Sequence, residues 1–450
     1  MSLHSPTQNQ VSSPSESPTG FLAAWDRLVG PKGVPTMPRR RGRKPRVPIN
    51  QLLPTLTFHV MQDAGTLADH LFQLFRQPLA DSSWSDRRLR LPWEIFADLM
   101  RRALRPRATA GRQREAFWRG WRLVALDGTQ FSLINTPQIT ATLVKAQTRR
   151  GRAAFAKITT AVLLELGLHN PLAAAIGRKG ESEWALAQRL LAQLPKRALL
   201  LGDRLYGVTA FAVQARAACA RVGSHFLLRA SRSVKPVLIK RLGDGSRLVR
   251  IAVRARNNPT RILEWLEVRE IRVRVGRAGH RSHELRLWTS LVDVRTAPAL
   301  ELAQLYAQRW EHELYFREVK RQVRKTDLLQ SHTVETAAQE IAALVLVSAL
   351  LAAERLRAAG GQIPVGRVSF TKILELCVKP MWLWLDLGHG VLTDHQLTQI
   401  MERGYDRMRR YVTPPRRARS CPRAVRQTMK AWPRLMQTQS VEGPLHFKLV

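Results

Sequence analysis

Between residues 122 and 230, the hydrophobic pattern alternates between the two-residue period of strands and the longer period of helices. RLVALDGTQFSLI predicts a strand ending at Asp-Gly, and FAKITTAVLLELG and PLAAAIGR predict two more strands, separated by the turn residues HNP. ESEWALAQRLLAQL is amphipathic and predicts a helix. RALLLGDRLYG then predicts a short buried strand that opens onto a loop at Asp203, followed by a helix and the strand HFLLRA. The segment therefore predicts an α/β fold.

This order of elements, three strands, a helix, a strand, a helix and a fifth strand, is that of an RNase H-like core, which needs one further helix carrying an acid. Residues 232–293 come first and are β-rich. In IRVRV, the two-residue period places the isoleucine and the valines on one face, and Arg272 and Arg274 on the other. Such arginines could simply keep an edge sheet soluble. In a chain this basic, we favour a sheet whose cationic face contacts DNA.

The charge of the chain restricts its partners. Of 450 residues, 73 are Lys or Arg and 34 are Asp or Glu, which gives a net charge of +39. Binding to a polyanion is the commonest reason for such an excess, although charge alone does not separate DNA from RNA or from an anionic membrane. A hydrophobic content of 45% excludes a disordered basic tail. The longest apolar run, IAALVLVSALLAA, is too short to span a bilayer, so we predict no membrane segment.

The cysteines and the N-terminus indicate the compartment. Cys219, Cys377 and Cys421 are far apart and have no metal-binding spacing, so we expect reduced thiols in a cytoplasmic protein. The first twenty residues are rich in Ser, Pro and Gln and contain no apolar core. This composition predicts a disordered segment rather than a signal peptide.

Three further segments are candidates for DNA contacts. The run PRRRGRKPRVP at 38–48 could place Arg41 and Arg43 in a minor groove, or it could be a flexible linker. Residues 50–105 show helical periodicity, which suits a small DNA-binding domain but equally a plain helical bundle. The basic stretch at 416–434 is a candidate phosphate contact or dimer element.

The segment YAQRWEHELYFREVK, at 306–320, aligns four unusual side chains. At 3.6 residues per turn, the phenol, guanidinium, carboxylate and ammonium groups fall within about 60° of one helix face. These groups belong to Tyr306, Arg309, Glu313 and Lys320. A solvated surface helix could carry the same face, as could a helix that leans over a metal ion and a nucleic-acid phosphate.

Three carboxylates could converge on such a site. Asp127 and Asp203 each follow a buried strand segment, and Glu313 lies on a helix that could pack beside both. Taken singly, each has an ordinary explanation, namely a turn, a helix cap and an ion pair with a neighbouring arginine. Together, they form a hard-oxygen set suited to two Mg²⁺ ions, or Mn²⁺ in their place, about 4 Å apart. Such a pair of ions supports in-line attack on a phosphodiester.

The motifs DGT at 127–129, GDRLYG at 202–207 and Y-x2-R-x3-E-x6-K starting at Tyr306 resemble those of DDE transposases of the insertion-sequence-four group, bacterial mobile elements. The β-rich insertion before the glutamate helix is also similar to that group. The resemblance implies that Asp127, Asp203 and Glu313 are the catalytic, metal-binding triad. It also implies that Tyr306, Arg309 and Lys320 contact DNA at the element end. A homodimer in a synaptic complex on nucleoid DNA is implied as well.

The sequence predicts an α/β chain with an RNase H-like catalytic core, a β-rich insertion, and helical regions at both ends. The expected parts are a disordered basic segment (1–49), a helical DNA-binding domain (50–118), the first part of the core (119–231), the insertion (232–295), the catalytic glutamate helix (296–330) and a helical C-terminal region with a basic tail (331–450). The expected function is binding of terminal inverted repeats with metal-dependent strand cleavage and strand transfer. A DNA-binding protein without catalysis and a nuclease of the same fold are the alternatives.

Two neighbouring acids and one aromatic residue sharpen these hypotheses. Glu311 and Glu318 point roughly 160° away from Glu313 on a regular helix, so they should not replace it. We expect a Glu318→Gln variant to remain active. Trp288 could stack on an unpaired base, but a strand tryptophan more often lies in the core, and we favour the core role.

Overall fold

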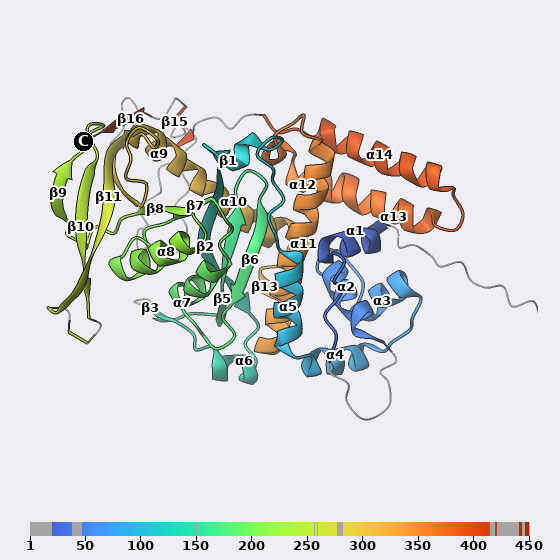
Figure 1. The fold of residues 1–450 in the computed structure, drawn as a ribbon. Helices are drawn as coiled ribbons and strands as arrows, with labels where there is room; N and C mark the ends of the chain where they lie inside the picture. Colours follow the sequence, from blue (N-terminus) through green and yellow to red (C-terminus); the bar gives the residue numbers. More distant parts are fainter. Residues whose placement is uncertain are drawn as a thin grey trace, which may run out of the picture.

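The structure is a computed structural model that describes residues 20–37, 47–148, 151–255, 257–258, 260–276, 282–414, 419–420, 441–442 and 446–449. Arg41, Arg43 and Cys421 lie outside these residues, as do residues 1–19 and most of the basic stretch at 416–434. The prediction of disorder throughout 1–49 was wrong for Gly20–Val29, which form a helix that buries Phe21 and Trp25. The described chain has a mixed α/β architecture in which helices pack on a long sheet (Figure 1). Cys219 and Cys377 are free and buried.

The centre of the sheet consists of five strands. β2 (Trp121–Leu133), β5 (Lys157–Glu165) and β6 (Asn170–Ile176) are antiparallel neighbours, whereas β7 (Ala198–Gly202) and β8 (His225–Arg229) run parallel to β2. Within the described residues, the sheet has twelve strands, with the main order β6-β5-β2-β7-β8-β12-β11-β10-β9. Three short strands join it off this path, namely β1 (Phe117–Trp118), β13 (Leu328–Leu329) and β16 (His446–Leu449).

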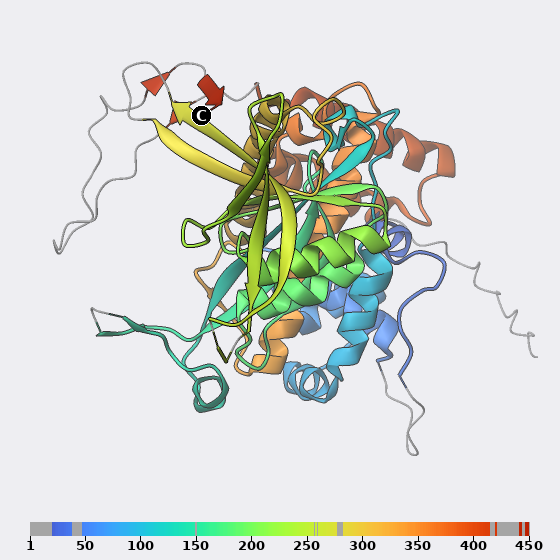
Figure 2. The ribbon, with the colours of Figure 1, turned by 60° about the vertical axis from the view of Figure 1, so that its left-hand side comes forward.

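Alternating residues of β2 divide the core between the two faces of the sheet. Val124 and Leu126 belong to one apolar cluster, which includes residues of α7 (Glu183–Leu190) and α8 (Thr209–Arg221). Leu123 and Ala125 belong to a second cluster, which includes residues of α5 (Trp93–Ala103) and α11 (Val334–Ala359). Figure 2 shows α7 and α8, drawn in green, side by side on their face of the sheet. Helices thus cover both faces of the central strands.

The β-rich segment continues the central sheet. Its strands are β9 (Val237–Arg241), β10 (Arg247–Arg254), β11 (Ile262–Gly276) and β12 (His283–Thr289), and β12 pairs with β8. Ile271 and Val273 are buried as the two-residue period predicts, and Arg274 is exposed. Arg272 is less free than expected, because its Nε donates to Glu270 at 2.7 Å. Trp288 is buried and its indole N–H donates to Glu270 at 3.3 Å, which confirms the core role.

Helices from both ends of the chain surround α11. On the N-terminal side are α1 (Gly20–Val29), α2 (Ile49–His59), α3 (Leu67–Phe75) and α4 (Asp81–Arg90), and on the C-terminal side are α12 (Phe370–Ile373), α13 (Lys379–Gly388) and α14 (Asp394–Arg410). α11 is long and apolar enough to cross a membrane, but 94% of its most apolar window is buried inside the protein. α11 is therefore a core helix, which contacts the central sheet through β6 and helices from both ends of the chain.

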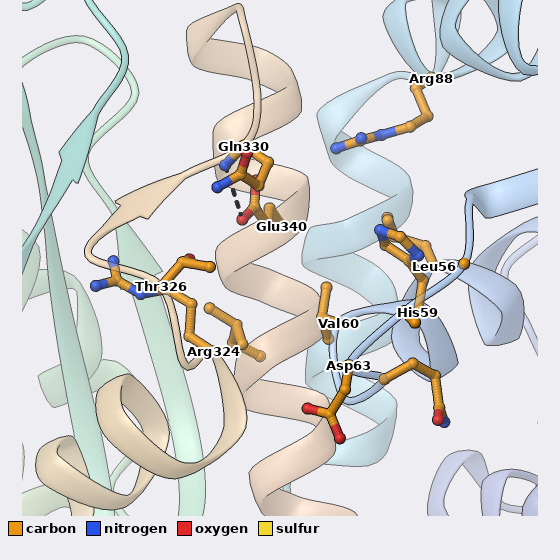
Figure 3. Close-up of a pocket in the computed structure, with 13 residues that line it drawn as sticks. Leu56, His59, Val60, Asp63, Arg88, Arg324, Thr326, Gln330 and Glu340 are labelled. Carbon is orange, nitrogen blue, oxygen red and sulfur yellow. Dashed lines mark hydrogen bonds between the residues drawn. The ribbon is translucent and has the colours of Figure 1, made fainter.

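The N-terminal region contacts the chain that follows the helical segment 299–323. Arg88 donates to the Thr336 carbonyl at 2.9 Å, and Asp63 accepts from Lys325 and, at 3.1 Å, from Lys379. Figure 3 shows the pocket of about 200 Å³ at this junction. His59 and Asp63 line it from the N-terminal side, opposite Arg324, Thr326, Gln330 and Glu340. These contacts fix the helical region against the part of the chain that carries the central sheet.

The remaining elements are short. They are α6 (Pro137–Thr142), the hairpin β3 (Gln147–Thr148) and β4 (Gly151–Arg152), the pair β14 (Arg419–Ser420) and β15 (Val441–Glu442), single helical turns at Arg114–Ala116, Leu191–Gln193 and Val365–Arg367, and a π-helical segment at Leu374–Val378.

The burial of α11 predicts a large difference between two leucine truncations. Leu350→Ala should lower the free energy of unfolding by about 2–5 kcal/mol, because it leaves a cavity beneath the sheet. Leu383→Ala on α13 should change it by less than about 0.5 kcal/mol, because that side chain is exposed. Urea denaturation followed by circular dichroism measures both. Equal losses would contradict the central position of α11.

Candidate active site

The pairing of β2 with β7 brings Asp127 and Asp203 together. The two strands are parallel, and their last registered pair is Leu126 with Gly202, so each aspartate is the next residue along its own chain. The prediction that the first strand ends at Asp-Gly was wrong, since β2 continues to Leu133. It continues because β5 pairs with it as far as Ser132. Asp127 therefore lies on a strand that β5 supports, and Asp203 lies where β7 gives way to a loop.

This arrangement disfavours the ionised form of the Asp127 carboxyl. Burial, followed by the charge of Asp203, raises its pKa from 3.8 to about 7. Arg309, 3.5 Å away, and the N–H of Gly128, which donates to Asp127 Oδ1 at 2.9 Å, act in the opposite direction. Two carboxylates held this close repel each other when both are ionised. The pair thus favours either a proton or an additional cation.

The predicted catalytic helix is interrupted twice. α9 (Ala299–Tyr306) passes into a 3₁₀ turn at Ala307–Arg309, then α10 (Trp310–Arg317), then a π-helical segment at Glu318–Val323. The prediction of one regular helix through 306–320 was therefore wrong. The buried His312 on α10 contacts the Val162 carbonyl of β5 at 3.0 Å, so the helix rests on the central strands.

Three of the four aligned side chains nevertheless contact the same part of the sheet, and the fourth, Glu313, pairs with Arg309. The Tyr306 hydroxyl donates to the Gly202 carbonyl at 3.1 Å, and Lys320 Nζ donates to the Gln130 carbonyl at 2.6 Å. Arg309 lies between Asp127, at 3.5 Å, and Glu313, at 2.7 Å. The helix face that carries Tyr306, Arg309 and Lys320 therefore packs against β2 and the end of β7.

The carboxylates fit a divalent cation chemically, but they are not assembled around one point. The paired aspartates supply hard oxygen atoms and lack a full counter-charge, which suits Mg²⁺. Glu313 is paired with Arg309 instead of joining them. Among the described residues, no group of three His, Cys, Asp or Glu side chains is placed to hold a metal ion. The guanidinium of Arg309 provides the positive charge between Asp127 and Glu313.

The chain matches known proteins over this same region. Residues 118–350 match the family model described as "Transposase DDE domain". The chain belongs to this family. Transposase InsG for insertion sequence element IS4, from Escherichia coli (strain K12), is 25% identical over 324 residues, which cover 70% of each chain. The resemblance to the insertion-sequence-four group is thereby confirmed. A piggyBac transposase in a synaptic complex with hairpin DNA is similar at a TM-score of 0.42 and 9% identity, over 86% of each chain.

In this DDE-domain chain, the two glutamates near Glu313 in the sequence, Glu311 and Glu318, make contacts away from the aspartate pair. Glu311 accepts the N–H of Gly167 at 2.7 Å. Glu318 lies 2.7 Å from Nδ1 of the buried His169 and 4.0 Å from Arg355. Neither contact involves the aspartate pair. Glu318→Gln would disturb a buried network, so an exposed glutamate is a better control for Glu313.

Two cations border the site beside the Phe131 ring. Lys320 Nζ lies 5.1 Å from the ring centroid, and the Arg324 guanidinium lies 5.6 Å from it. Burial, together with the charges of Arg324 and Lys157, lowers the pKa of Lys320 from 10.5 to about 8. A phosphate bound between Lys320 and Arg324 would offset the repulsion between these two positive charges.

The sequence analysis missed a fourth acid next to the site. Glu183, the first residue of α7, accepts a hydrogen bond from the Tyr206 hydroxyl at 2.8 Å. Ser182 is the N-cap of α7, with Glu181 before it and Glu183 after it. Acidic residues are common at the N-terminus of a helix, so the local sequence does not distinguish Glu183 from Glu181. Tyr206 is the signal that could have identified Glu183. A tyrosine hydroxyl that becomes buried needs a hydrogen-bond partner, and Tyr206 is fully buried.

The raised pKa of Asp127 predicts a pH-dependent gain in stability for Asp127→Asn without divalent cations. The folded-state pKa is above the unfolded value, so wild-type stability falls as the pH rises from about 4 to about 7. Asp127→Asn removes this loss and should raise the Tm by a few degrees at pH 8, in EDTA, with the difference shrinking towards pH 4. Differential scanning fluorimetry measures it. Asp86→Asn, at an exposed position of α4, is the control and should show no such trend. A lower Tm for Asp127→Asn at pH 8 would contradict the repulsion.

Proposed function

We propose that this DNA transposase binds the terminal inverted repeats of its element, cleaves there, and joins the freed 3′ ends to target DNA by in-line attack on phosphodiesters. The observation that carries the proposal is the adjacency of Asp127 and Asp203, with Arg309 connecting Asp127 to Glu313. A surplus of 39 positive charges supports a polyanionic substrate. Together with the match to the transposase family, this surplus supports DNA as the partner.

Asp127, Asp203 and Glu313 would hold two Mg²⁺ ions, with Mn²⁺ able to replace them. When bound, these ions activate the attacking oxygen and stabilise the leaving oxygen. The residues of the chain prepare that site: β2 and β7 fix the two aspartates, and the contact of α10 with β5 fixes the level of Glu313. The raised pKa of Asp127 means that cation binding has to displace a proton from the pair near neutral pH.

Arg309 would exchange partners when the site is loaded. Without cations or DNA, it neutralises Asp127 and Glu313. Once cations neutralise the same carboxylates, its guanidinium becomes available to a phosphate, which it can bind through two N–H groups. Tyr306 keeps the helix against the Gly202 carbonyl, and Lys320 contacts the Gln130 carbonyl. Both side chains would contact the DNA strand in the loaded site.

The wider architecture supports the finer parts of the proposal. The central order β6-β5-β2-β7-β8, with three antiparallel strands followed by two parallel ones, supports an RNase H-like core. The helical residues 50–118 would bind the element end, with Arg274 and Arg272 of the β-rich insertion as further contacts and Arg41 and Arg43 as contacts from the preceding segment. We also propose a homodimer in the synaptic complex, acting on bacterial nucleoid DNA in the cytoplasm.

A DNA-binding protein without catalysis and a nuclease of the same fold are the alternatives. One reaction separates the three functions: the protein is incubated with a labelled element end, MgCl₂ and a target plasmid. A joined product supports the transposase, cleavage without joining supports the nuclease, and binding without cleavage supports the DNA-binding protein. The proposal stands only if strand-transfer products form.

Loss of Glu313 should abolish chemistry while sparing DNA binding. Glu313→Gln keeps the size of the side chain but removes the charge that a divalent cation needs, so cleavage should fall by at least about 100-fold. Binding to a labelled end, measured by gel shift in EDTA, should change less than about threefold. Glu402→Gln, on the exposed side of α14, is the matched control and should cleave like the wild type. Equal cleavage by both variants would refute the role of Glu313.

Lys320 should contribute one ionic contact to the DNA. For Lys320→Met, the slope of log K against log salt should decrease in magnitude by about 0.9, the value for a single phosphate contact on B-DNA. Fluorescence anisotropy over a range of KCl concentrations measures the slope. Lys372→Met, whose ammonium lies over the Tyr411 ring, is the comparison variant and should leave the slope unchanged. An unaltered slope in Lys320→Met would remove Lys320 from the interface.

A further inference from the structure

The carboxylate of Glu183 is packed against the backbone of Gly128. A Cβ atom at position 128 would collide with the Glu183 carboxyl carbon and would lie 2.6 Å from its Oε2. The Gly128 N–H donates to Asp127 Oδ1 at 2.9 Å, so the same residue contacts both carboxylates. Glu183 therefore fills the space next to position 128 of the DGT motif, and a side chain at that position would force the Glu183 carboxylate to move.

The same carboxylate is connected to the loop that carries Asp203. Glu183 Oε1 accepts the Tyr206 hydroxyl at 2.8 Å, and Tyr206 is buried against the Phe211 ring, 4.8 Å away between centroids. The Tyr206 N–H donates to the Asp203 carbonyl at 3.2 Å, and the Leu205 N–H donates to Asp203 Oδ1 at 2.7 Å. Displacing Tyr206 would therefore displace the turn that orients Asp203.

Glu183 is held in place by its own helix. Ser182 caps α7 by accepting the Ala185 N–H at 3.3 Å, and the apolar side of α7, including Leu186 and Leu190, is packed on the central sheet. A carboxylate in the first turn is also stabilised by the helix N-terminus. The group is thus preorganised, and α7 can transmit its position to both aspartates.

We infer that Glu183 is a positioning residue that joins the Asp-Gly-Thr strand to the Gly-Asp-Arg-Leu-Tyr-Gly loop and so sets the separation of Asp127 and Asp203 for divalent cations. The inference rests on the proposed function of those aspartates. Its contacts are with Gly128 and Tyr206, and through them it acts on the two residues that would hold the ions. Changing it should therefore weaken cation binding more than it weakens the fold.

Cation binding can be measured without activity. The Tm of the full chain is followed while MgCl₂, and separately MnCl₂, is titrated, since a ligand that binds only the folded state raises the Tm. Glu183→Ala should raise the cation concentration for half of the maximal shift by about tenfold, the effect typical of a residue that orients metal ligands. Glu183→Gln, which can still accept from Tyr206, should fall between. Glu181→Gln is the matched control, because Glu181 contacts Lys179 and Arg189 instead of the site.

Cleavage of a labelled element end provides the second readout. For Glu183→Ala, the MgCl₂ concentration at half-maximal rate should rise about tenfold, and the rate at saturating MgCl₂ should fall by about tenfold as well. Tyr206→Phe should show a smaller rise by itself and no further rise in the Glu183→Ala background, because the two groups act as one unit.

The outcomes separate the inference from the proposed function. If the wild type binds cations and cleaves but Glu183→Ala has wild-type cation dependence and only a lower Tm, Glu183 is a purely structural residue and the inference fails alone. Additive effects of Glu183→Ala and Tyr206→Phe would overturn it too. If the wild type neither binds cations nor cleaves, the proposed function fails, and the inference that rests on it fails with it.

Discussion

The parallel pairing of β2 with β7 is the constraint on which the site depends. Because the last pair in register is Leu126 with Gly202, Asp127 and Asp203 follow at the same level of the sheet. Both faces of these strands are buried by helices, so neither strand can slip without exposing its apolar residues. The carboxylates are consequently held together against their own repulsion by the hydrophobic core. A more flexible support would allow them to separate.

The charge arrangement follows from that forced proximity. Burial, followed by the charge of Asp203, raises the pKa of Asp127, and Arg309 offsets part of the negative charge while also binding Glu313. The interrupted helix makes this possible, since its 3₁₀ turn places Arg309 over β2 and its π-helical segment brings Lys320 to the Gln130 carbonyl. π-helical segments inside α-helices are frequent at functional sites. The helix thus provides positive charge on both sides of the carboxylates.

The parts around the core are more closely integrated than a chain of separate domains. β12 pairs with β8, so the β-rich insertion extends the central sheet. α11 packs on β6 and on the N-terminal helices, and Arg88 and Asp63 connect the N-terminal region to Thr336 and Lys325, which follow α10 in the chain. The helical region is therefore in direct contact with the segment that follows Glu313.

The sequence by itself determined the order of strands and helices, the three candidate carboxylates, and the helix face that meets them, because these depend on local periodicity and on motifs within single segments. It could not decide where β2 ends, since β5 extends it, or where the catalytic helix is interrupted. It also could not show that Trp288 and Arg272 share Glu270, or that Glu183 and not Glu181 reaches Gly128. Those outcomes depend on which distant residues become neighbours, and only the tertiary structure brings those residues together.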